Sequence, residues 1–293
     1  MAVPPGSAEA VRDSPTGNPR RGCCTPLAMT ARLPDEHHPV VAWLAELATR
    51  ADIRVVAVSG PQGAGKSTVC ARAVETLRAR GLRAVTVSID DFYLTHDAQR
   101  ALAARFEGNR YLEHRGYPGT HDVALGRDVI AGLCEDRGAG VAVPVYDKST
   151  HEGRGDRLPR ERWRIERGPF DLVLVEGWML GFVPVEASAL PDPALEPANA
   201  ALVAYSAWHA LADAMALMVM ADPSYVLRWR VDAERARRAA GAPGLTDAEA
   251  LDYVLRFLPA YATWVPAMRA NPPVRGPSRV VTLGEDRAPI AVE

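Results

Sequence analysis

The chain has 293 residues, of which 48% are apolar and 24% are charged, and its formal net charge is -2. This length is enough for one large globular domain or two small ones. The near balance of charges lacks the basic excess of nucleic-acid-binding proteins, so we expect no nucleic-acid partner.

The N-terminal segment is rich in Pro, Gly, Ser and Arg and has no helical or strand periodicity. We therefore expect a disordered leader over residues 1–34 and a single domain over residues 35–293. The longest apolar run, near residues 207–221, is too short to cross a bilayer, so we expect no membrane partner. Four scattered cysteines without a C-x-x-C pair, and no secretory signal, predict a cytoplasmic protein.

Apolar strands alternate with helices along the rest of the chain, which indicates an α/β fold with a mostly parallel sheet and helices on both faces. Two segments break the alternation: residues 139–169 are dense in charges and favour loops, and residues 184–197 form a proline-rich connection. In chain order the pattern predicts helix 40–50, strand 53–59, helix 67–80, strand 83–89, helices 97–106 and 122–136, strand 170–175, helix 200–212, strand 215–220, helices 224–240 and 246–268, and strand 279–283.

The sequence GPQGAGKS, from Gly60 to Ser67, matches the glycine-rich Walker A pattern G-x-x-x-x-G-K-S. It follows a predicted strand and opens a predicted helix, which is the context that the pattern requires. Backbone N–H groups of such a turn bind phosphate, Lys66 can reach the β- and γ-phosphates, and the Ser67 hydroxyl can coordinate Mg²⁺. The motif predicts a three-layer P-loop NTPase fold that binds a nucleoside triphosphate. The expected phosphate-binding residues are Gly60, Gly63, Ala64, Gly65, Lys66, Ser67 and Thr68.

Acidic residues end two of the predicted strands. Asp90 and Asp91 follow the strand 83–89, where a carboxylate can accept a proton from a substrate hydroxyl. By position alone, each of them is as well explained as a cap of a turn. Glu176 ends the strand DLVLVEG, which is a Walker B-like position near the Mg²⁺ ion. We therefore expect Ser67 and Glu176 at the metal.

Two polar segments, residues 115–122 and 144–157, lie between the second and third predicted strands. Their Arg and Lys side chains suit a carboxylate or phosphate substrate, although solvated loops often have the same composition. The helix 225–240 carries five arginines, and such a helix can close over a transferring phosphoryl group. For any single one of these arginines, a solvated helix face is the simpler interpretation.

Six segments together resemble the D-glycerate 3-kinase family, over about residues 40–285. They are GPQGAGKST, SIDDFYLT, RGYPGTHD, VPVYDKSTHEGRGDR, VLVEGWMLGF and LRWRVDAE. This family is similar to uridine kinase, phosphoribulokinase and bacterial pantothenate kinase. The Walker A segment is unspecific, whereas YDKS…GRGDR, EGWMLGF and the helix that contains WR are much more specific.

The resemblance implies ATP-dependent phosphorylation of a hydroxyl group on a small molecule, with Mg²⁺ and with glycerate as the leading acceptor. It implies that Asp90 is the base and that Glu176 is the Walker B-like acid. It also places Arg230 and Arg235 on a lid helix. The candidate catalytic residues are Asp90, Lys66, Glu176 and Arg230, and the candidate substrate-binding residues are Arg115, His121, Asp122, Tyr146, Lys148 and Arg157.

Tyr117, His151 and the proline-rich stretch 184–199 depart from the family pattern, and the two substitutions leave the acceptor open. Pantothenate, uridine and another sugar acid are alternative acceptors, but the cation-rich loops favour an acid. A GTPase-like switch or a nucleotide-binding module without turnover is a further alternative. It is disfavoured because the guanine-reading motif N/T-K-x-D is missing. The sequence does not predict an oligomeric state.

Overall fold

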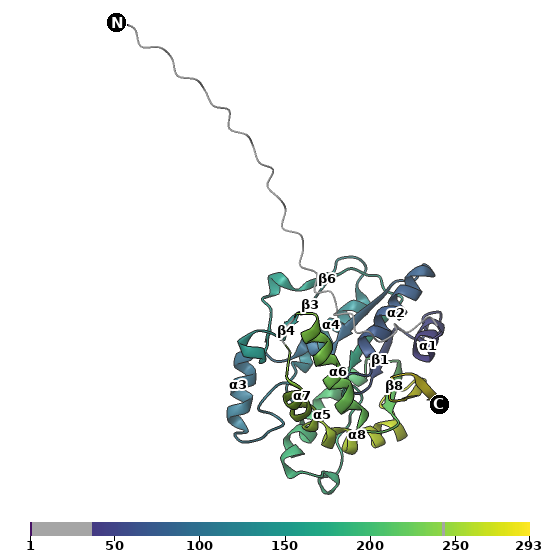
Figure 1. Cartoon of the computed structure of the whole chain (residues 1–293). Helices are drawn as coiled ribbons and strands as arrows, with labels where there is room; N and C mark the ends of the chain where they lie inside the picture. Colours follow the sequence, from purple (N-terminus) through teal and green to yellow (C-terminus); the bar gives the residue numbers. More distant parts are fainter. Residues whose placement is uncertain (2–36, 242–243) are drawn as a thin grey trace.

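A twisted six-stranded sheet forms the centre of the molecule in the computed structural model, which describes Met1 and residues 37–241 and 244–293 (Figure 1). Apart from Met1, the expected leader lies outside these residues. The strand order is β10-β9-β8-β1-β7-β2, and every neighbouring pair is parallel except β9 with β10. The strands are β1 (Val55–Ser59), β2 (Ala84–Ser88), β7 (Leu172–Gly177), β8 (Ala214–Met220), β9 (Ser278–Leu283) and β10 (Pro289–Val292).

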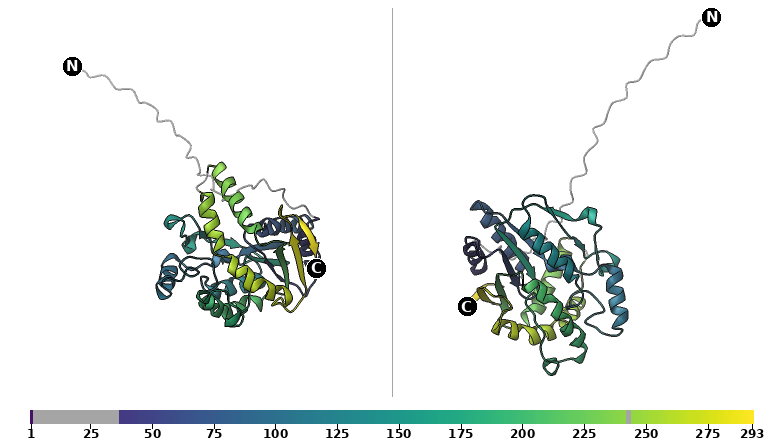
Figure 2. Two further views of the ribbon diagram at one scale, coloured as in Figure 1. Left: turned by 60° about the horizontal axis from the view of Figure 1, so that its bottom comes forward. Right: turned by 180° about the vertical axis from the view of Figure 1, so that it is seen from behind.

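Helices cover both faces of the sheet, as Figure 2 shows from two further directions. Successive residues of a strand point to opposite faces, so Val56 and Val58 pack with α1 and α2, whereas Val55 and Ala57 pack with α4, α5 and α8. The predicted three-layer α/β fold is therefore confirmed. The covering helices are α1 (Pro39–Leu47), α2 (Lys66–Ala79), α4 (Val123–Glu135), α5 (Glu196–His209) and α8 (Leu258–Ala270).

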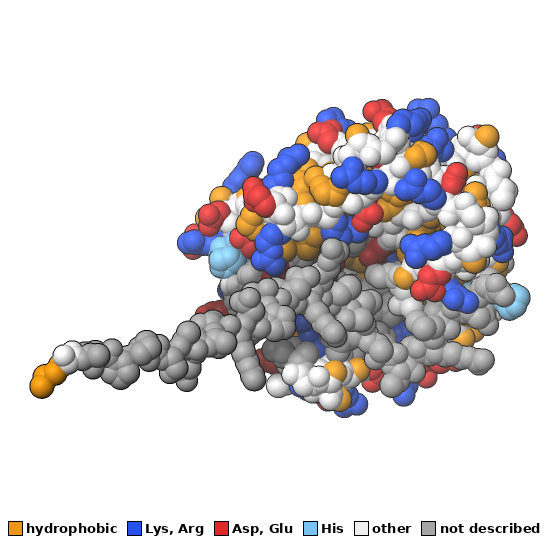
Figure 3. Space-filling model, turned by 90° about the horizontal axis from the view of Figure 1, so that it is seen from above, with side chains coloured by type: hydrophobic (Ala, Val, Ile, Leu, Met, Phe, Trp, Pro, Cys, Tyr) orange, Lys and Arg blue, Asp and Glu red, His pale blue; other side chains and the backbone are white. Residues whose placement is uncertain are grey.

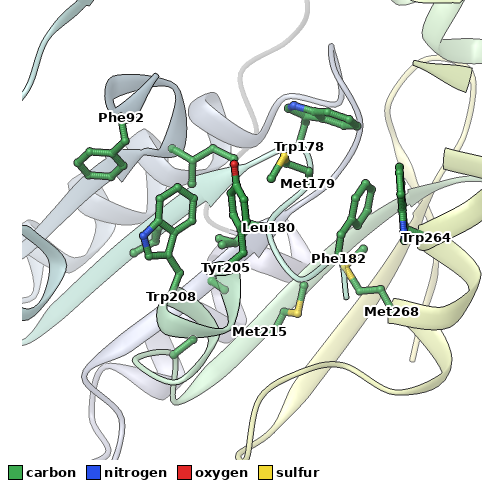
Figure 4. Close-up of a cluster of buried hydrophobic side chains, with 14 of the residues drawn as sticks. Phe92, Trp178, Met179, Leu180, Phe182, Tyr205, Trp208, Met215, Trp264 and Met268 are labelled. Carbon is green, nitrogen blue, oxygen red and sulfur yellow. The ribbon is translucent and has the colours of Figure 1, made fainter. Parts of the chain in front are cut away.

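Aromatic side chains of the segment that follows β7 pack in a buried cluster with α8 (Figure 4). Phe182 stacks on Trp264 of α8 with ring centroids 5.6 Å apart, and the Trp178 ring meets Phe182 edge-on at 5.6 Å. All three side chains are at most 4% exposed. Large buried aromatic side chains dominate the energetics of a core. The cluster therefore fixes the carboxyl end of β7, where Glu176 lies.

Three helices extend beyond the two covering layers: α3 (His96–Arg105), α6 (Tyr225–Ala239) and α7 (Asp247–Leu255). In the left view of Figure 2, α6 and α7 lie side by side and project away from the sheet as a hairpin. The N-terminus of α7 carries a complete capping box, in which Thr246 and Glu249 each bond the other's backbone N–H. We refer to α6 and α7 together as the α6–α7 hairpin.

The structure corrects the sequence analysis at several elements. Residues 139–169 contain two small antiparallel sheets, whose strands of two or three residues are too short to show a period. The predicted helix 246–268 is two helices, and Pro259 lies in the first turn of the second one, α8, where a proline is favoured. Strand β10 follows the last predicted strand. The small sheets pair β3 (Val141–Val143) with β6 (Arg164–Glu166), and β4 (Tyr146–Asp147) with β5 (Asp156–Arg157).

Within the described ranges, no helix combines the length and the apolar character needed to cross a membrane. Lys and Arg side chains are interspersed with Asp and Glu over the face seen in Figure 3. Among the described side chains visible there, neither sign forms a continuous patch.

Candidate active site

The glycine-rich turn lies between β1 and α2, with its backbone in conformations that favour glycine. Gly63 has a φ of 80° and Gly65, the N-cap of α2, has a φ of 89°, both in the left-handed region. A Cβ atom on Gly60 would lie only 2.9 Å from Met218. The turn thus leads directly into α2, whose first backbone N–H groups have no intrahelical partner and suit an anion.

Lys66 and Ser67, the first two residues of α2, bond to the backbone of the glycine-rich turn and to Glu176, respectively. Lys66 is 9% exposed and its Nζ donates to the Pro61 carbonyl oxygen over 3.0 Å. Burial lowers the pKa of Lys66, while the carboxylates of Glu176 and Asp90 act in the opposite direction. The Ser67 hydroxyl donates to Glu176 Oε1 over 2.9 Å. Ser67 and Glu176, on different elements, are therefore neighbours.

Ser67 and Glu176 offer a hydroxyl and a carboxylate to a metal ion. The described residues contain no group of three or more His, Cys, Asp or Glu side chains that could hold a metal by themselves. Mg²⁺ commonly uses only one or two protein oxygens and takes its other ligands from water and phosphate. The pair therefore fits a Mg²⁺ ion that arrives with the nucleotide.

Asp90 lies in the 3₁₀ turn η1 (Ile89–Phe92), directly after β2, and is paired with Lys148. Lys148 Nζ is 2.5 Å from Asp90 Oδ2, and the Asp90 side chain is 30% exposed. Burial favours the neutral carboxyl, but the Lys148 charge, its hydrogen bond and a hydrogen bond from Tyr93 lower the pKa of Asp90 to about 2. Ser88 of β2 pairs with Glu176 of β7, so Asp90 lies at the same edge of the sheet as the P-loop.

Asp91 has different partners from those of Asp90. Its carboxylate is 3.3 Å from the Arg164 guanidinium of β6, and this arginine also binds Glu166. Burial raises the pKa of Asp91 to about 6, against the lowering effect of Arg164. Of the two adjacent acids, Asp90 is therefore the one beside Lys148.

Of the predicted substrate-binding residues, Lys148 contacts Asp90 directly, whereas Arg115 and Tyr146 lie on the far side of Tyr93, which hydrogen-bonds to Asp90. The Arg115 guanidinium lies over the Tyr146 ring, 5.5 Å from its centroid, and donates to the Gly153 carbonyl oxygen over 2.8 Å. The Tyr146 ring meets the Tyr93 ring edge-on at 5.4 Å. These side chains connect the loop at residue 115 to Asp90 through Tyr93.

The other three predicted substrate-binding residues, His121, Asp122 and Arg157, lie next to Tyr93 and contact it or one another. His121 is 5% exposed and stacks on the Tyr93 ring at 4.4 Å. Arg157 is 3.3 Å from Asp122 and donates to the Tyr93 carbonyl oxygen over 2.8 Å. Asp122 also caps α4 through the Leu125 N–H. These contacts hold Tyr93 in place.

The two departures from the family pattern have local explanations. Tyr117 is 1% exposed, stacks on Phe257 at 5.3 Å and is therefore a core residue. His151 stacks on His96 at 3.8 Å and lies 3.4 Å from Asp156. Neither side chain contacts Asp90 or Lys148 through a hydrogen bond or ion pair in the described chain.

The arginines of α6 are largely paired within the α6–α7 hairpin and its surroundings. Arg230 is 2.6 Å from Glu234, and its guanidinium lies over the Tyr253 ring of α7 at 4.5 Å. Arg235 binds Asp247 at the start of α7. The helix nevertheless reaches the P-loop, because a Cβ atom on Gly63 would lie 3.0 Å from Trp229.

Several residues of the site were missed by the sequence analysis. Tyr93 lies inside the quoted segment SIDDFYLT, so its proximity to Asp90 was a usable signal. Tyr253, in the last turn of α7, and Arg256, its C-cap, carry no signal in the sequence, because the pattern over residues 246–268 predicts one continuous helix. Arg287, which donates to the Gly63 carbonyl oxygen over 2.8 Å, follows β9 and carries no local signal.

The strand order and the glycine-rich turn at the start of α2 define a P-loop NTPase-type protein with an acidic side chain beyond the neighbouring strand. No model of a known protein family matches the sequence. The structure resembles the D-glycerate 3-kinase of Cryptococcus neoformans var. grubii, with a TM-score of 0.77 and 30% identity over 87% of this chain and 96% of that one.

Two sequence relatives agree with this likeness. The chain is 40% identical over 244 residues to the chloroplastic D-glycerate 3-kinase of Arabidopsis thaliana, a match that covers 80% of this chain and 54% of that protein. It therefore spans about half the length of that relative. It is also 30% identical over 251 residues to an uncharacterized kinase of Schizosaccharomyces pombe, covering 81% of this chain and 90% of that protein. The chain belongs to the D-glycerate 3-kinase family.

Proposed function

We propose that this chain transfers the γ-phosphoryl group of ATP to a hydroxyl group of D-glycerate. The observation that carries the proposal is the Asp90–Lys148 pair, 2.5 Å apart, at the sheet edge where Glu176 bonds to the P-loop Ser67. Phosphoryl transfer needs a base, a phosphate-binding loop and cations within reach of one another. D-glycerate as the acceptor is supported by the names of the Arabidopsis and Cryptococcus relatives.

In the proposed reaction the acceptor hydroxyl oxygen attacks the γ-phosphorus of ATP. The bond from the γ-phosphorus to the bridging oxygen breaks, ADP leaves, and the hydroxyl proton passes to the Asp90 carboxylate. Lys66 and the N-terminus of α2 stabilise the negative charge on the phosphates. Arg230, on the α6–α7 hairpin, is the lid arginine that we assign to the transferring group.

Mg²⁺ is part of the proposal, with Ser67 and Glu176 as the residues that would hold it. Their oxygens lie 2.9 Å apart at the mouth of the P-loop, which supports this assignment. When bound, the ion neutralises charge on the phosphate oxygens. We expect ADP formation to stop when EDTA is added in excess over Mg²⁺.

An anionic acceptor is supported by the cations around Asp90. Arg115 and Lys148 lie on the acceptor side, whereas a uridine kinase would need a flat, neutral surface for the base. Cytoplasmic action is also part of the proposal, and Cys70 and Cys134 fit it because both are free thiols.

The proposal is tested with the purified full chain, Mg-ATP and an acceptor panel of D-glycerate, L-glycerate, glycerol, pantothenate and uridine. ADP release is measured in a coupled assay, and the product is identified by phosphorus NMR, which separates the 2-phosphate from the 3-phosphate. We expect D-glycerate to give the highest kcat/KM, and Lys66→Ala to remove turnover with every acceptor. Preference for uridine or pantothenate, a strong preference for GTP, or ADP release that no acceptor stimulates would contradict the proposal.

A further inference from the structure

Arg256, at the junction of α7 and α8, is a partly buried arginine without an acidic partner in the described chain. Its guanidinium lies over the rings of Tyr253 and Phe257, at 4.8 and 5.3 Å from their centroids. Its Nε is buried and has no hydrogen-bond partner. By contrast, Arg230 and Arg235 of the same hairpin bind Glu234 and Asp247. Removing a charge from water without a counter-ion is unfavourable, and contacts with aromatic rings offset only part of that cost.

The loop that carries Arg115 packs directly against the Arg256 junction. The Tyr117 hydroxyl donates to the Arg256 carbonyl oxygen over 2.6 Å. A Cβ atom on Gly116 would lie 3.0 Å from the Phe257 ring, so the loop backbone touches that side chain. Burial lowers the pKa of His114, and the positive charges of Arg154 and Arg256 lower it further. Arg256 therefore lies beside the loop that carries Arg115.

Tyr253 connects the same face of α7 to the reaction centre. Arg230 and Arg256 both lie over its ring, so two positive charges converge on one side chain. The pKa of Lys148 is raised chiefly by Asp90 and in smaller part by Tyr253, which lies within electrostatic range of it. Arg256 is thus linked, through the Tyr253 ring, to the surroundings of Lys148.

The other cations of the acceptor side already have partners. Lys148 is bonded to Asp90, and Arg157 is bonded to Asp122 and the Tyr93 backbone. Arg115 donates to backbone carbonyl oxygens of the turn at Gly153. Arg256 is the cation of this set whose guanidinium makes no hydrogen bond to a protein oxygen among the described residues.

We propose that Arg256 binds the carboxylate group of the acceptor and so selects small hydroxy acids over neutral alcohols. The Tyr253 ring packs against the Arg256 guanidinium and holds it in position. This inference rests on the proposed function. The planar guanidinium can form two parallel hydrogen bonds to a carboxylate, which a lysine cannot do. Binding would supply the counter-ion that the folded chain lacks at this position.

The test combines a change in the enzyme with a change in the acceptor. The full chain and its Arg256→Gln variant are assayed with D-glycerate and with D-glyceramide, which replaces the carboxylate by a neutral amide. Arg256→Lys keeps the positive charge but cannot form two parallel hydrogen bonds to a carboxylate. Arg237→Gln, at an exposed position of α6, is the matched control for the loss of one positive charge from the hairpin.

If Arg256 binds the carboxylate, Arg256→Gln raises the KM for D-glycerate by about tenfold or more while the KM for ATP changes little. For D-glyceramide the same substitution changes KM by less than about twofold, because the interaction is already missing. Arg256→Lys gives an intermediate KM, and Arg237→Gln matches the unchanged chain. Equal losses with both acceptors would identify a purely structural residue and overturn the inference.

Failure of the proposed function gives a different result from failure of this inference. If the unchanged chain phosphorylates another acid in the panel, such as pantothenate, the Arg256 variants are compared with that acid and its amide. The same pattern of KM changes then supports the inference, and equal losses with both acceptors overturn it. If only neutral acceptors react, there is no carboxylate to bind and the inference is wrong. If Arg256→Gln does not fold, the Arg256→Lys variant is used instead. The ratio of the KM for D-glyceramide to the KM for D-glycerate must then be smaller in Arg256→Lys than in the unchanged chain.

Discussion

Lys148 Nζ lies 2.5 Å from Asp90 Oδ2, so the proposed base is held in an ion pair with the first residue of the turn that follows β4. The pair orients the carboxylate and keeps it ionised, with a pKa of about 2. It also makes Asp90 a weaker base than a free carboxylate. An acceptor hydroxyl bound beside it would therefore lose its proton late, as the bond to phosphorus forms.

Asp90→Asn should remove most turnover and leave nucleotide binding nearly intact. The amide keeps the shape of the side chain but cannot take the hydroxyl proton, a loss worth about 10²- to 10⁴-fold in kcat. Steady-state kinetics with D-glycerate give kcat, and titration with a fluorescent ATP analogue gives the nucleotide affinity. Asp91→Asn is the matched control because it removes the adjacent carboxylate, which binds Arg164 instead. Full turnover in Asp90→Asn would rule out the assignment of Asp90 as the base.

Lys148→Met should move the acidic limb of the pH–rate profile to higher pH. Lys148 is the main group that lowers the pKa of Asp90 from its usual 3.8 against the effect of burial. Without it, burial should raise the pKa above the usual value, so that activity falls below about pH 5. The measurement is kcat between pH 4.5 and 8, with Lys148→Arg as the control that keeps the charge. A profile that is as flat as that of the unchanged chain would mean that Asp90 is not the titrating base.

The elements that the sequence predicted are those with a local signal. Apolar runs of five to seven residues identify the central strands, and the glycine-rich turn identifies the start of α2 because its motif and its context agree. The strand-end acids followed from position, since the carboxyl ends of parallel strands share one edge of a sheet. In contrast, the two- and three-residue strands of the segment 139–169 form only because the tertiary fold brings them together.

The candidate site was predictable on the nucleotide side and less so on the acceptor side. Arg157 and Lys148 come from one polar segment and look equivalent in sequence. The fold places Arg157 under Tyr93, with a side chain 11% exposed, and leaves Lys148 54% exposed beside Asp90. Arg256 meets the loop that carries Arg115 only because α7 ends against that loop at Tyr117. Such relationships depend on packing between distant segments, which no local pattern records.

Arg157→Met should lower stability more than it changes the affinity for the acceptor. The substitution breaks the pair with Asp122 and the hydrogen bond to the Tyr93 carbonyl oxygen, and leaves a partly buried carboxylate unpaired. We expect a loss of about 1 to 2 kcal/mol in the free energy of unfolding and a lower kcat, with little change in the KM for D-glycerate. Urea unfolding and steady-state kinetics measure these quantities. Arg160→Met, at an exposed position three residues away, is the control. Unchanged stability with a raised KM would show instead that Arg157 binds the acceptor.

Asp91→Asn should stabilise the protein relative to the unchanged chain at neutral pH and lose that advantage in acid. Burial raises the pKa of Asp91 to about 6, from 3.8 in the unfolded chain. Between these two values the folded state binds more protons than the unfolded state, so the contribution of Asp91 is fully favourable below pH 3.8 and is lost as pH rises through 6. Asparagine resembles the protonated acid at every pH. The difference in unfolding free energy between the two proteins should therefore change by up to about 3 kcal/mol, since each pKa unit is worth about 1.36 kcal/mol.

Urea unfolding of both proteins at pH 4.5, 6 and 7.5 measures this difference. Asp128→Asn, which removes an exposed carboxylate from α4, reports the effect of losing one negative charge from the surface. If the ion pair with Arg164 outweighs burial, the sign is reversed: Asp91→Asn then becomes less stable than the unchanged chain as pH rises. That result would show that Asp91 is ionised through its pair with Arg164 across the physiological range, and that the assignment of a raised pKa to Asp91 is wrong.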